Sequence, residues 1–388
     1  MNLCPPPDFA PPHPVRFLIA PDKFKGSLTA EEAAKAIRDG FARALPDAEF
    51  DICPLADGGE GTAAMCLEAL GGQWIEAPCQ DALGRPATAR YAWIPSRRMA
   101  VVDLSAASGL LRIAPCERDP LRATTIGTGQ LVRHAIGAGA ESVVIGLGGS
   151  ATNDAGTGIA AALGWRFVAA DGQTLDPCPA NFAAITKFVP PPTLPGAALV
   201  GLADIRSPLL GPRGCSLCYA PQKGASPADA EFLESSLRIL AGRCEDHFFE
   251  TFSAAPGAGA AGGTGFGLMT FLQARVVPGF EWLARLVRLD ERVAAADCVV
   301  TGEGSIDSQT ADGKAPDELA RIARRNGKRI IAFCGVAEPG ATGAFDACFP
   351  LAGGDISRDE SIRNAGSLLR AEALRAAGIV FPRPSGLD

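Results

Sequence analysis

The chain lacks several features that would place it in other classes of protein. No apolar stretch approaches the roughly 18 residues that a membrane span needs. No block of five like charges occurs and the formal net charge is −7, which disfavours a nucleic-acid or acidic-membrane surface. The proline-rich start, Met1–Val15, has no apolar segment typical of a signal peptide, so we expect a cytoplasmic protein.

The usual residues of nucleophilic and zinc sites are also scarce or scattered. The chain has three histidines, and none lies near a serine or cysteine motif, which disfavours a Ser-His or Cys-His nucleophile. The twelve cysteines lie in apolar runs and are expected to be mostly reduced core residues. Cys215 and Cys218 have C-x-x-C spacing, but 215–220 is predicted to be a strand, in which residues three apart face opposite sides.

Aromatic residues make up only 6% of the chain, whereas alanine and glycine are abundant. Small side chains let helices pack closely on a sheet, which favours an α/β fold over a β-sandwich. At 388 residues the chain exceeds the size of a single core, so we expect two domains. Short extended runs with turn residues over 73–104 predict hairpins and a domain boundary near residue 76.

Five short apolar runs each end at a turn that carries a carboxylate. The acids at these ends are Asp22, Asp57, Asp154, Asp204 and Glu303. In a parallel sheet the carboxyl ends of the strands point one way, so we expect the five turns to converge on one crevice. Acids and backbone N–H groups gathered there suggest a metal-bound phosphate.

The first of these turns, 21–27, holds Asp22, Lys23 and Lys25 before a helix that is predicted to run to about residue 45. Thr29 and Glu32 form the capping box that starts this helix. A helix N-terminus beside two lysines favours an anion, and a solvated turn is the alternative.

Two further turns are rich in glycine. Residues 57–62 combine two acids with three glycines, which let the backbone approach a ligand while the acids hold a cation or cap the next helix. Residues 148–154 resemble an anion nest followed by an acid. The residues singled out in these turns are Asp57, Gly58, Gly59, Glu60, Gly61, Gly148, Gly149, Ser150, Thr152, Asn153 and Asp154.

A polar segment near the carboxyl end follows the strand predicted over 297–301. Its candidate residues are Gly302, Glu303, Gly304, Asp307, Thr310 and Lys314. Lys314 precedes a helix opened by Pro316, an arrangement that attracts phosphate, and a long polar surface loop is the alternative. A single helix is predicted over 359–377.

Residues 257–262 spell G-x-G-x-x-G, but the preceding 250–255 is a poor strand. We therefore expect 256–267 to be a flexible loop that caps the following helix, with dinucleotide binding as the rival interpretation. The sequence contains neither a P-loop motif nor the protein-kinase set. Phosphoryl transfer requires neither, because its catalysis is mainly positioning and charge neutralisation.

Taken together, these segments resemble the bacterial glycerate kinases that make 2-phosphoglycerate. The matching stretches, in family order, are 20–27, 56–62, 146–154, 221–224, 257–263 and 301–304 with Asp307 and Thr310. One departure is Ser207 before Pro208, where the family usually has asparagine.

The resemblance implies two α/β domains, one inserted in the other, with Rossmann- or flavodoxin-like three-layer parts and largely parallel sheets. The active site would lie in the cleft between them. We expect a disordered proline-rich head over 1–14, a discontinuous domain of 15–75 with 285–388, and an inserted domain of 76–284.

The resemblance also implies transfer of the ATP γ-phosphoryl group to the 2-hydroxyl of (R)-glycerate, with Mg²⁺ as the usual cation. Asp204, or else Asp57, would accept the hydroxyl proton, and Lys25 with Lys23 would neutralise charge. The hypothesised metal ligands are Asp154, Glu303 and Asp307. The remaining turn residues named above, Asp22, Thr310 and Lys314 included, would bind substrate or nucleotide.

Other functions stay open from the residues alone. Phosphate could go to the 3-hydroxyl or to a related small hydroxy acid, since only the resemblance favours carbon 2. A nucleotide-dependent oxidoreductase would use the glycines of 257–262. A non-catalytic solute-binding protein is the third alternative, and a homo-oligomer is not excluded.

Overall fold

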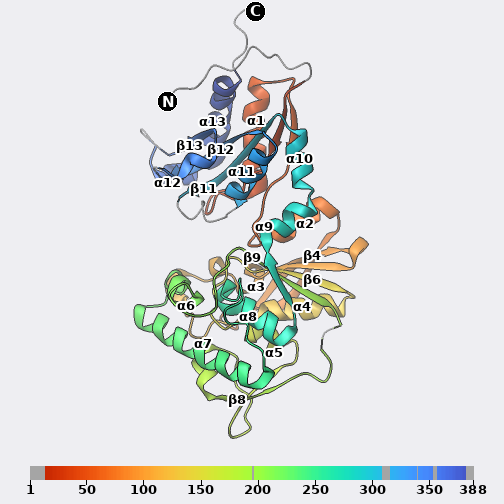
Figure 1. Ribbon diagram of the computed structural model, residues 1–388, viewed down its shortest axis with the longest axis vertical. Coiled ribbons are helices and arrows are strands. Elements are labelled where there is room, and N and C mark those ends of the chain that lie inside the picture. The colour runs from red at the N-terminus through yellow and green to blue at the C-terminus, as the bar shows by residue number, and fades with distance from the viewer. Residues whose placement is uncertain (1–13, 195, 308–314, 339, 353–355, 382–388) are drawn as a thin grey trace, which may run out of the picture. The chain divides into compact units, whose positions relative to one another are not determined.

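The computed structural model describes residues 14–194, 196–307, 315–338, 340–352 and 356–381. Backbone contacts divide the chain into two compact units, one from Met1–Leu55 with Val287–Asp388 and one from Ala56–Leu286. Each unit is an α/β structure with a largely parallel sheet, which confirms the expected fold class (Figure 1). Most of the expected proline-rich head lies outside the described residues.

The first unit contains a five-stranded sheet in the order β13-β12-β11-β1-β2, and every neighbouring pair is parallel. Its strands are β1 (Arg16–Ile19), β2 (Glu49–Ile52), β11 (Cys298–Ile306), β12 (Arg329–Ala337) and β13 (Ala347–Pro350). Its helices are α1 (Ala30–Ala44), α10 (Leu289–Ala295), α11 (Ala315–Arg325), α12 (Arg358–Arg363) and α13 (Ala365–Val380).

Helices α1 and α13 pack together against the sheet of this unit, and their buried side chains form one core with those of β1, β11 and β12 (Figure 1). Gly40 permits this close packing, because a Cβ atom there would lie 2.6 Å from the Cβ of Ala373. Helices α10 and α11 contact the same sheet through β1, β11 and β12.

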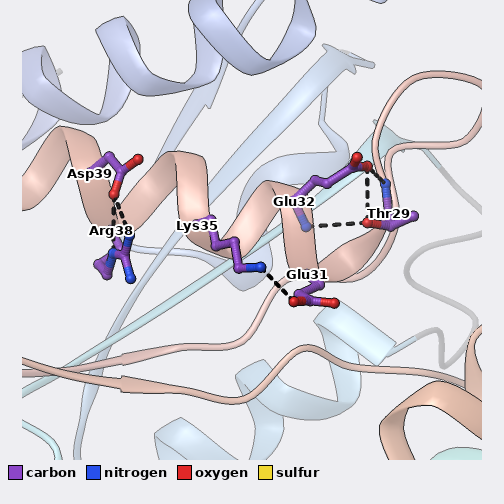
Figure 2. Close-up of polar contacts among 6 residues, drawn as sticks. All are labelled: Thr29, Glu31, Glu32, Lys35, Arg38 and Asp39. Carbon is purple, nitrogen blue, oxygen red and sulfur yellow. Dashed lines mark hydrogen bonds and ion pairs between the residues drawn. The ribbon is translucent and has the colours of Figure 1, made fainter. Parts of the chain in front are cut away.

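The start of α1 follows the predicted capping box. Figure 2 shows the Glu32 carboxylate accepting hydrogen bonds from the backbone N–H and the hydroxyl of Thr29, at 2.8 and 2.9 Å. The Glu32 N–H in turn donates to the Thr29 hydroxyl. The Glu32 carboxylate and the Thr29 hydroxyl thus accept from N–H groups that have no partner within the helix. These bonds fix where α1 begins after the loop 21–27.

The second unit contains a six-stranded sheet in the order β10-β9-β6-β5-β4-β3. Its first four strands are parallel, while β4 and β3 complete it as the antiparallel hairpin predicted from the sequence. The strands are β3 (Gln73–Gln80), β4 (Pro86–Ile94), β5 (Met99–Asp103), β6 (Ser142–Gly146), β9 (Ala198–Ala203) and β10 (Arg275–Pro278), with a separate pair, β7 (Arg166–Ala169) and β8 (Ile185–Val189).

Helices α4, α5, α7 and α8 share a core with this sheet. The helices of the unit are α2 (Thr62–Leu70), α3 (Ser105–Ser108), α4 (Ile126–Gly137), α5 (Thr157–Ala162), α6 (Cys215–Tyr219), α7 (Pro227–Phe248), α8 (Ala260–Leu272) and α9 (Gly279–Leu286). Short 3₁₀ turns are η1 (Pro95–Arg97), η2 (Leu110–Arg112), η3 (Pro115–Glu117), η4 (Pro179–Ala184) and η5 (Pro221–Lys223), and η7 (Ala341–Ala344) belongs to the first unit.

The division into units differs from the sequence-based boundary over residues 56–75. The Asp103 carboxylate at the end of β5 accepts hydrogen bonds from the backbone N–H groups of Gly61 and Ala63, both at 3.0 Å. These bonds attach the turn before α2, and α2 itself, to the second unit. The assignment of 15–75 with 285–388 to one domain stays a prediction.

Three local predictions are wrong. Residues 215–219 were predicted to be a strand but form helix α6. The prediction failed because an apolar run of five residues is too short for its periodicity to distinguish a helix from a strand. Cys215 is buried, Cys218 is exposed, and both are free thiols. The helix expected over 359–377 is two helices, α12 and α13, separated at Asn364.

The third error concerns 256–267, which is not a flexible loop. All residues from Gly257 to Leu268 are buried, and 260–267 belong to α8. Left-handed φ angles at Ala261, Gly262 and Gly263 kink this helix, and glycine adopts such angles without strain at two of the three positions.

None of the helices in the described parts of the chain combines the length and hydropathy needed to cross a lipid bilayer.

Candidate active site

Four of the five carboxylate-bearing turns fall into two groups, each with its own sheet, and the fifth, at Asp57, lies between β2 of the first unit and α2 of the second. Asp22 follows β1 and Glu303 lies in β11, the neighbouring central strands of the first unit. Asp154 follows β6 and Asp204 follows β9 in the second unit. These acids therefore belong to two sheets, which short apolar runs do not reveal, and the expectation that the five turns converge on one crevice stays a prediction.

In the first unit, the loop 21–27 lies along the end of β11. The Asp22 N–H donates to the Gly302 carbonyl at 2.8 Å, and a Cβ atom on Gly304 would lie 3.0 Å from the backbone nitrogen of Lys25. Residues 302–306 continue the strand, so the expected turn at Glu303 is not formed. The two glycines thus let the loop and the strand approach each other closely.

The loop itself is anchored by Phe24, which is buried and pairs with Leu28 in an isolated bridge. Asp22 is buried and accepts a hydrogen bond from the Lys23 N–H at 2.7 Å. Lys25 is exposed.

Two of the hypothesised Mg²⁺ ligands, Glu303 and Asp307, belong to the described part of the first unit. Glu303 is buried near the end of β11 and Asp307 follows that strand directly. Over the described ranges, no three or more His, Cys, Asp or Glu side chains form a ready-made metal cluster. Mg²⁺ bound through one or two carboxylates plus substrate phosphates needs no such cluster, so this donor set is compatible with it. Thr310 and Lys314 lie outside the described residues.

In the second unit, three segments that are distant in the sequence meet at one point. The Gly148 N–H donates to the Gly58 carbonyl at 3.4 Å, and a Cβ atom on Gly148 would lie 2.5 Å from the Cα of Gly59 and 3.4 Å from Asp204 Oδ2. Asp204 is itself exposed. The predicted candidates Gly58, Gly59, Gly148 and Asp204 are therefore brought together.

Asp57 shapes the turn that carries these glycines. Its Oδ1 accepts a hydrogen bond from the Gly59 N–H at 3.0 Å. Gly58 and Gly61 have φ angles of +97° and +99°, which residues with a Cβ rarely adopt. Glu60 is exposed beside this turn.

Gly148→Ala is expected to lower kcat/KM at least about tenfold, because its Cβ would displace the backbone at Gly59 and the Asp204 carboxylate. Steady-state assays with purified protein measure this change. Gly242→Ala in α7 is the matched control, since nothing lies within 4 Å of the added methyl group. Equal activity of the two variants would contradict the assignment of Gly148 to the site.

Asp154, a hypothesised metal ligand, is fully buried and engaged within the protein. Its Oδ2 accepts from the N–H and hydroxyl of Thr125 at 2.7 and 2.8 Å, and from the Thr124 hydroxyl and the Gly158 N–H at 3.3 and 3.2 Å. Oδ1 accepts from the Gly156 N–H at 3.2 Å. Burial raises the pKa of the Asp154 carboxyl, and these donors act in the opposite direction. The side chain holds α4 and α5 together.

Asp154→Ala is expected to lower the free energy of unfolding by about 3 kcal/mol, because it strands several buried donors. Urea denaturation measures the loss. Asp171→Ala serves as the control, because Asp171 is exposed and accepts a single hydrogen bond, from the Gln173 N–H. A loss no larger than that of the control would refute the structural role.

Lys223 is a functional candidate for which no role was predicted from the sequence. It is only 3% exposed, and its ammonium group donates to the Ser150 hydroxyl at 2.9 Å and to the Thr152 carbonyl at 2.7 Å. The matching segment 221–224 was the available signal, but a single lysine in a turn does not reveal burial.

The 148–154 turn also carries polar atoms without a partner. In the described structure, Thr152 Oγ1 and Asn153 Oδ1 are buried and accept no hydrogen bond. Asn153 Nδ2 donates to the Ser216 hydroxyl at 3.1 Å. Gly149 is exposed and its carbonyl accepts from the Leu110 N–H at 2.9 Å.

The glycines of the G-x-G-x-x-G stretch pack against protein. The Ala155 N–H donates to the Gly262 carbonyl at 3.0 Å, and a Cβ on Gly262 would collide with the Thr152 carbonyl. A Cβ on Gly257 would lie 3.0 Å from Val276, and one on Gly259 would collide with the Pro208 carbonyl. Gly262 therefore supports the 148–154 turn. In the described chain the element before these glycines is helix α7, whereas a dinucleotide site follows a strand.

Comparison with known proteins agrees with these features. The family model described as the glycerate kinase family matches residues 17–380. A glycerate kinase of Halalkalibacterium halodurans is 38% identical over 367 residues, covering 93% of this chain and 97% of the relative. A glycerate 2-kinase of Escherichia coli is 36% identical over 324 residues, covering 83% of this chain and 85% of the relative.

A solved structure from Salmonella typhimurium LT2, described as a candidate glycerate kinase 2, superposes with a TM-score of 0.80 at 36% identity. The match covers 95% of this chain and 98% of that chain. The chain belongs to the glycerate kinase family.

Proposed function

We propose that this protein transfers the γ-phosphoryl group of ATP to the 2-hydroxyl of (R)-glycerate, giving 2-phosphoglycerate and ADP. The observation that carries the proposal is the family match over 17–380. The glycerate 2-kinase of Escherichia coli, 36% identical, favours carbon 2 over carbon 3. We place the reaction in the cytoplasm, since ATP is its donor.

Asp204 is the proposed general base. It is exposed, and its Oδ2 would lie 3.4 Å from a Cβ atom on Gly148. A base must lie within roughly 3 Å of the proton that it accepts, and an exposed carboxylate beside a glycine surface allows that approach. Asp57 is the second candidate, although its Oδ1 already accepts from the Gly59 N–H.

Lys25 is proposed to neutralise the negative charge that develops on the transferring phosphoryl group. Positively charged and N–H donors placed around that group lower the barrier, because the reaction offers little covalent chemistry for the protein to perform. Lys23 and the backbone at Gly302 and Gly304 would add further contacts to the nucleotide.

Glu303 and Asp307 are the proposed ligands of Mg²⁺, through oxygen atoms that suit this cation. The ion would bridge phosphate oxygens and offset their charge when bound. Asp154 keeps its structural role in this proposal, since its carboxylate oxygens already accept hydrogen bonds within the protein.

Glycerate-dependent release of ADP tests the function. Purified protein with ATP and Mg²⁺ should release ADP when D-glycerate is added, and release should be much slower with L-glycerate or with no acid. Binding of glycerate without ADP release would instead support a solute-binding protein, and a related hydroxy acid that reacts faster would change the assigned substrate.

A further inference from the structure

Lys223 carries a buried positive charge on neutral partners. Its ammonium group donates to a hydroxyl and to a backbone carbonyl, both in the 148–154 turn. Burial of an ammonium group lowers the stability of the folded protein unless an anion pairs with it. Burial lowers the pKa of Lys223 to about 8, while the nearby acids Asp154 and Asp204 favour its protonated form.

The turn that Lys223 contacts is held from a second side by α3 and η2. The Ala151 N–H donates to the Ser108 carbonyl and the Leu110 N–H donates to the Gly149 carbonyl, both at 2.9 Å. Lys223 of η5 contacts Ser150 and Thr152 of the same turn. The backbone from Gly148 to Thr152 is thus held by α3 and η2 on one side and by η5 on the other, and Gly149 in this turn is exposed.

This clamped backbone adjoins the proposed base. Gly148 lies against Asp204, and glycerate must place its hydroxyl at that carboxylate if the proposed function is correct. The carboxylate of so small an acid then lies within a few ångströms of the turn, and the positive charge of Lys223, which contacts Ser150 and Thr152 of that turn, favours an anion there.

We infer that Lys223 is a positioning residue for the acceptor substrate, which holds the 148–152 backbone in the geometry that binds the carboxylate of glycerate. It acts through Ser150 and Thr152 and touches neither glycerate nor ATP. The inference rests on the proposed function.

Lys223→Met keeps the length of the side chain and removes its charge and donors. We expect kcat/KM for glycerate to fall about 100-fold with KM for ATP nearly unchanged, because a small shift of the turn misplaces the acceptor alone. Lys223→Arg, which restores charge and donors, should regain part of the loss. A role confined to stability would lower the melting temperature without this split between the two substrates.

Arg243→Met is the matched control. Arg243 also donates to backbone carbonyls of the second unit, those of Phe182, Ala183 and Ile185, but these lie in η4 and at the start of β8. This variant should lose stability and keep its KM for glycerate. If Lys223→Met fails to fold, Ser150→Ala removes one acceptor of the lysine and should raise KM for glycerate selectively.

The outcomes separate the two hypotheses. A wild-type protein with no glycerate-dependent ADP release would refute the proposed function. The inference alone would be overturned if the wild type is active and the Lys223→Met and Ser150→Ala variants keep kcat/KM for glycerate within threefold. It would also be overturned if these variants bind glycerate and ATP equally poorly.

Discussion

Asp204→Asn is expected to lower kcat by about 10³-fold, because asparagine keeps the shape of the side chain but cannot accept the hydroxyl proton. The proposed base is exposed and lies against Gly148, so the substitution should leave the fold and the melting temperature unchanged. Coupled measurement of ADP release at saturating ATP and glycerate gives the effect.

Two further variants show whether the loss of activity is specific to Asp204. Asp171→Asn changes another exposed aspartate of the second unit and should remain fully active. Asp57→Asn should cost less than Asp204→Asn, since Asp57 accepts from the Gly59 N–H and shapes the turn. A larger loss of kcat in Asp57→Asn than in Asp204→Asn would make Asp57 the general base instead of Asp204.

Lys25→Ala should lower kcat by about 10²- to 10³-fold, because it removes a full positive charge from the transferring phosphoryl group. Lys25 is exposed in the 21–27 loop, so the substitution should leave the fold and the melting temperature unchanged. Steady-state kinetics at varied ATP measure it.

Lys35→Ala is the control for this prediction, since Lys35 is an exposed lysine of α1 that pairs with Glu31 (Figure 2). Surface pairs of this kind contribute little, so the control should retain its activity and nearly all of its stability. A Lys25→Ala enzyme that turns over within tenfold of the parent would remove Lys25 from the chemistry.

Much of the fold could be predicted because its signals are local. The Thr29 and Glu32 capping box fixes the start of α1 through bonds three residues apart. Turn residues between extended runs likewise indicated the β3 and β4 hairpin. Where the signal depends on the rest of the molecule, prediction failed: the pairing of β11 with β12 extends the strand beyond the expected end at 301.

The site was predicted in part for the same reason. Glycine-rich turns after apolar runs pointed to Gly58, Gly148 and Asp204, and the structure brings these residues together. Lys223 lay in a matching stretch but was given no role, and Asp103 was missed, because their contacts are with residues more than 40 positions away, Thr152 and Gly61. The division of the acids between two sheets also depends on strand pairing, which short runs do not encode.

Phosphorus NMR of the protein incubated with ATP, Mg²⁺ and D-glycerate tests the central claim most directly. We predict conversion of ATP to ADP with a new phosphomonoester signal split into a doublet, because carbon 2 of glycerate carries a single hydrogen. A triplet would show phosphate on carbon 3 and contradict the regiochemistry. Unchanged ATP signals would contradict the kinase assignment itself.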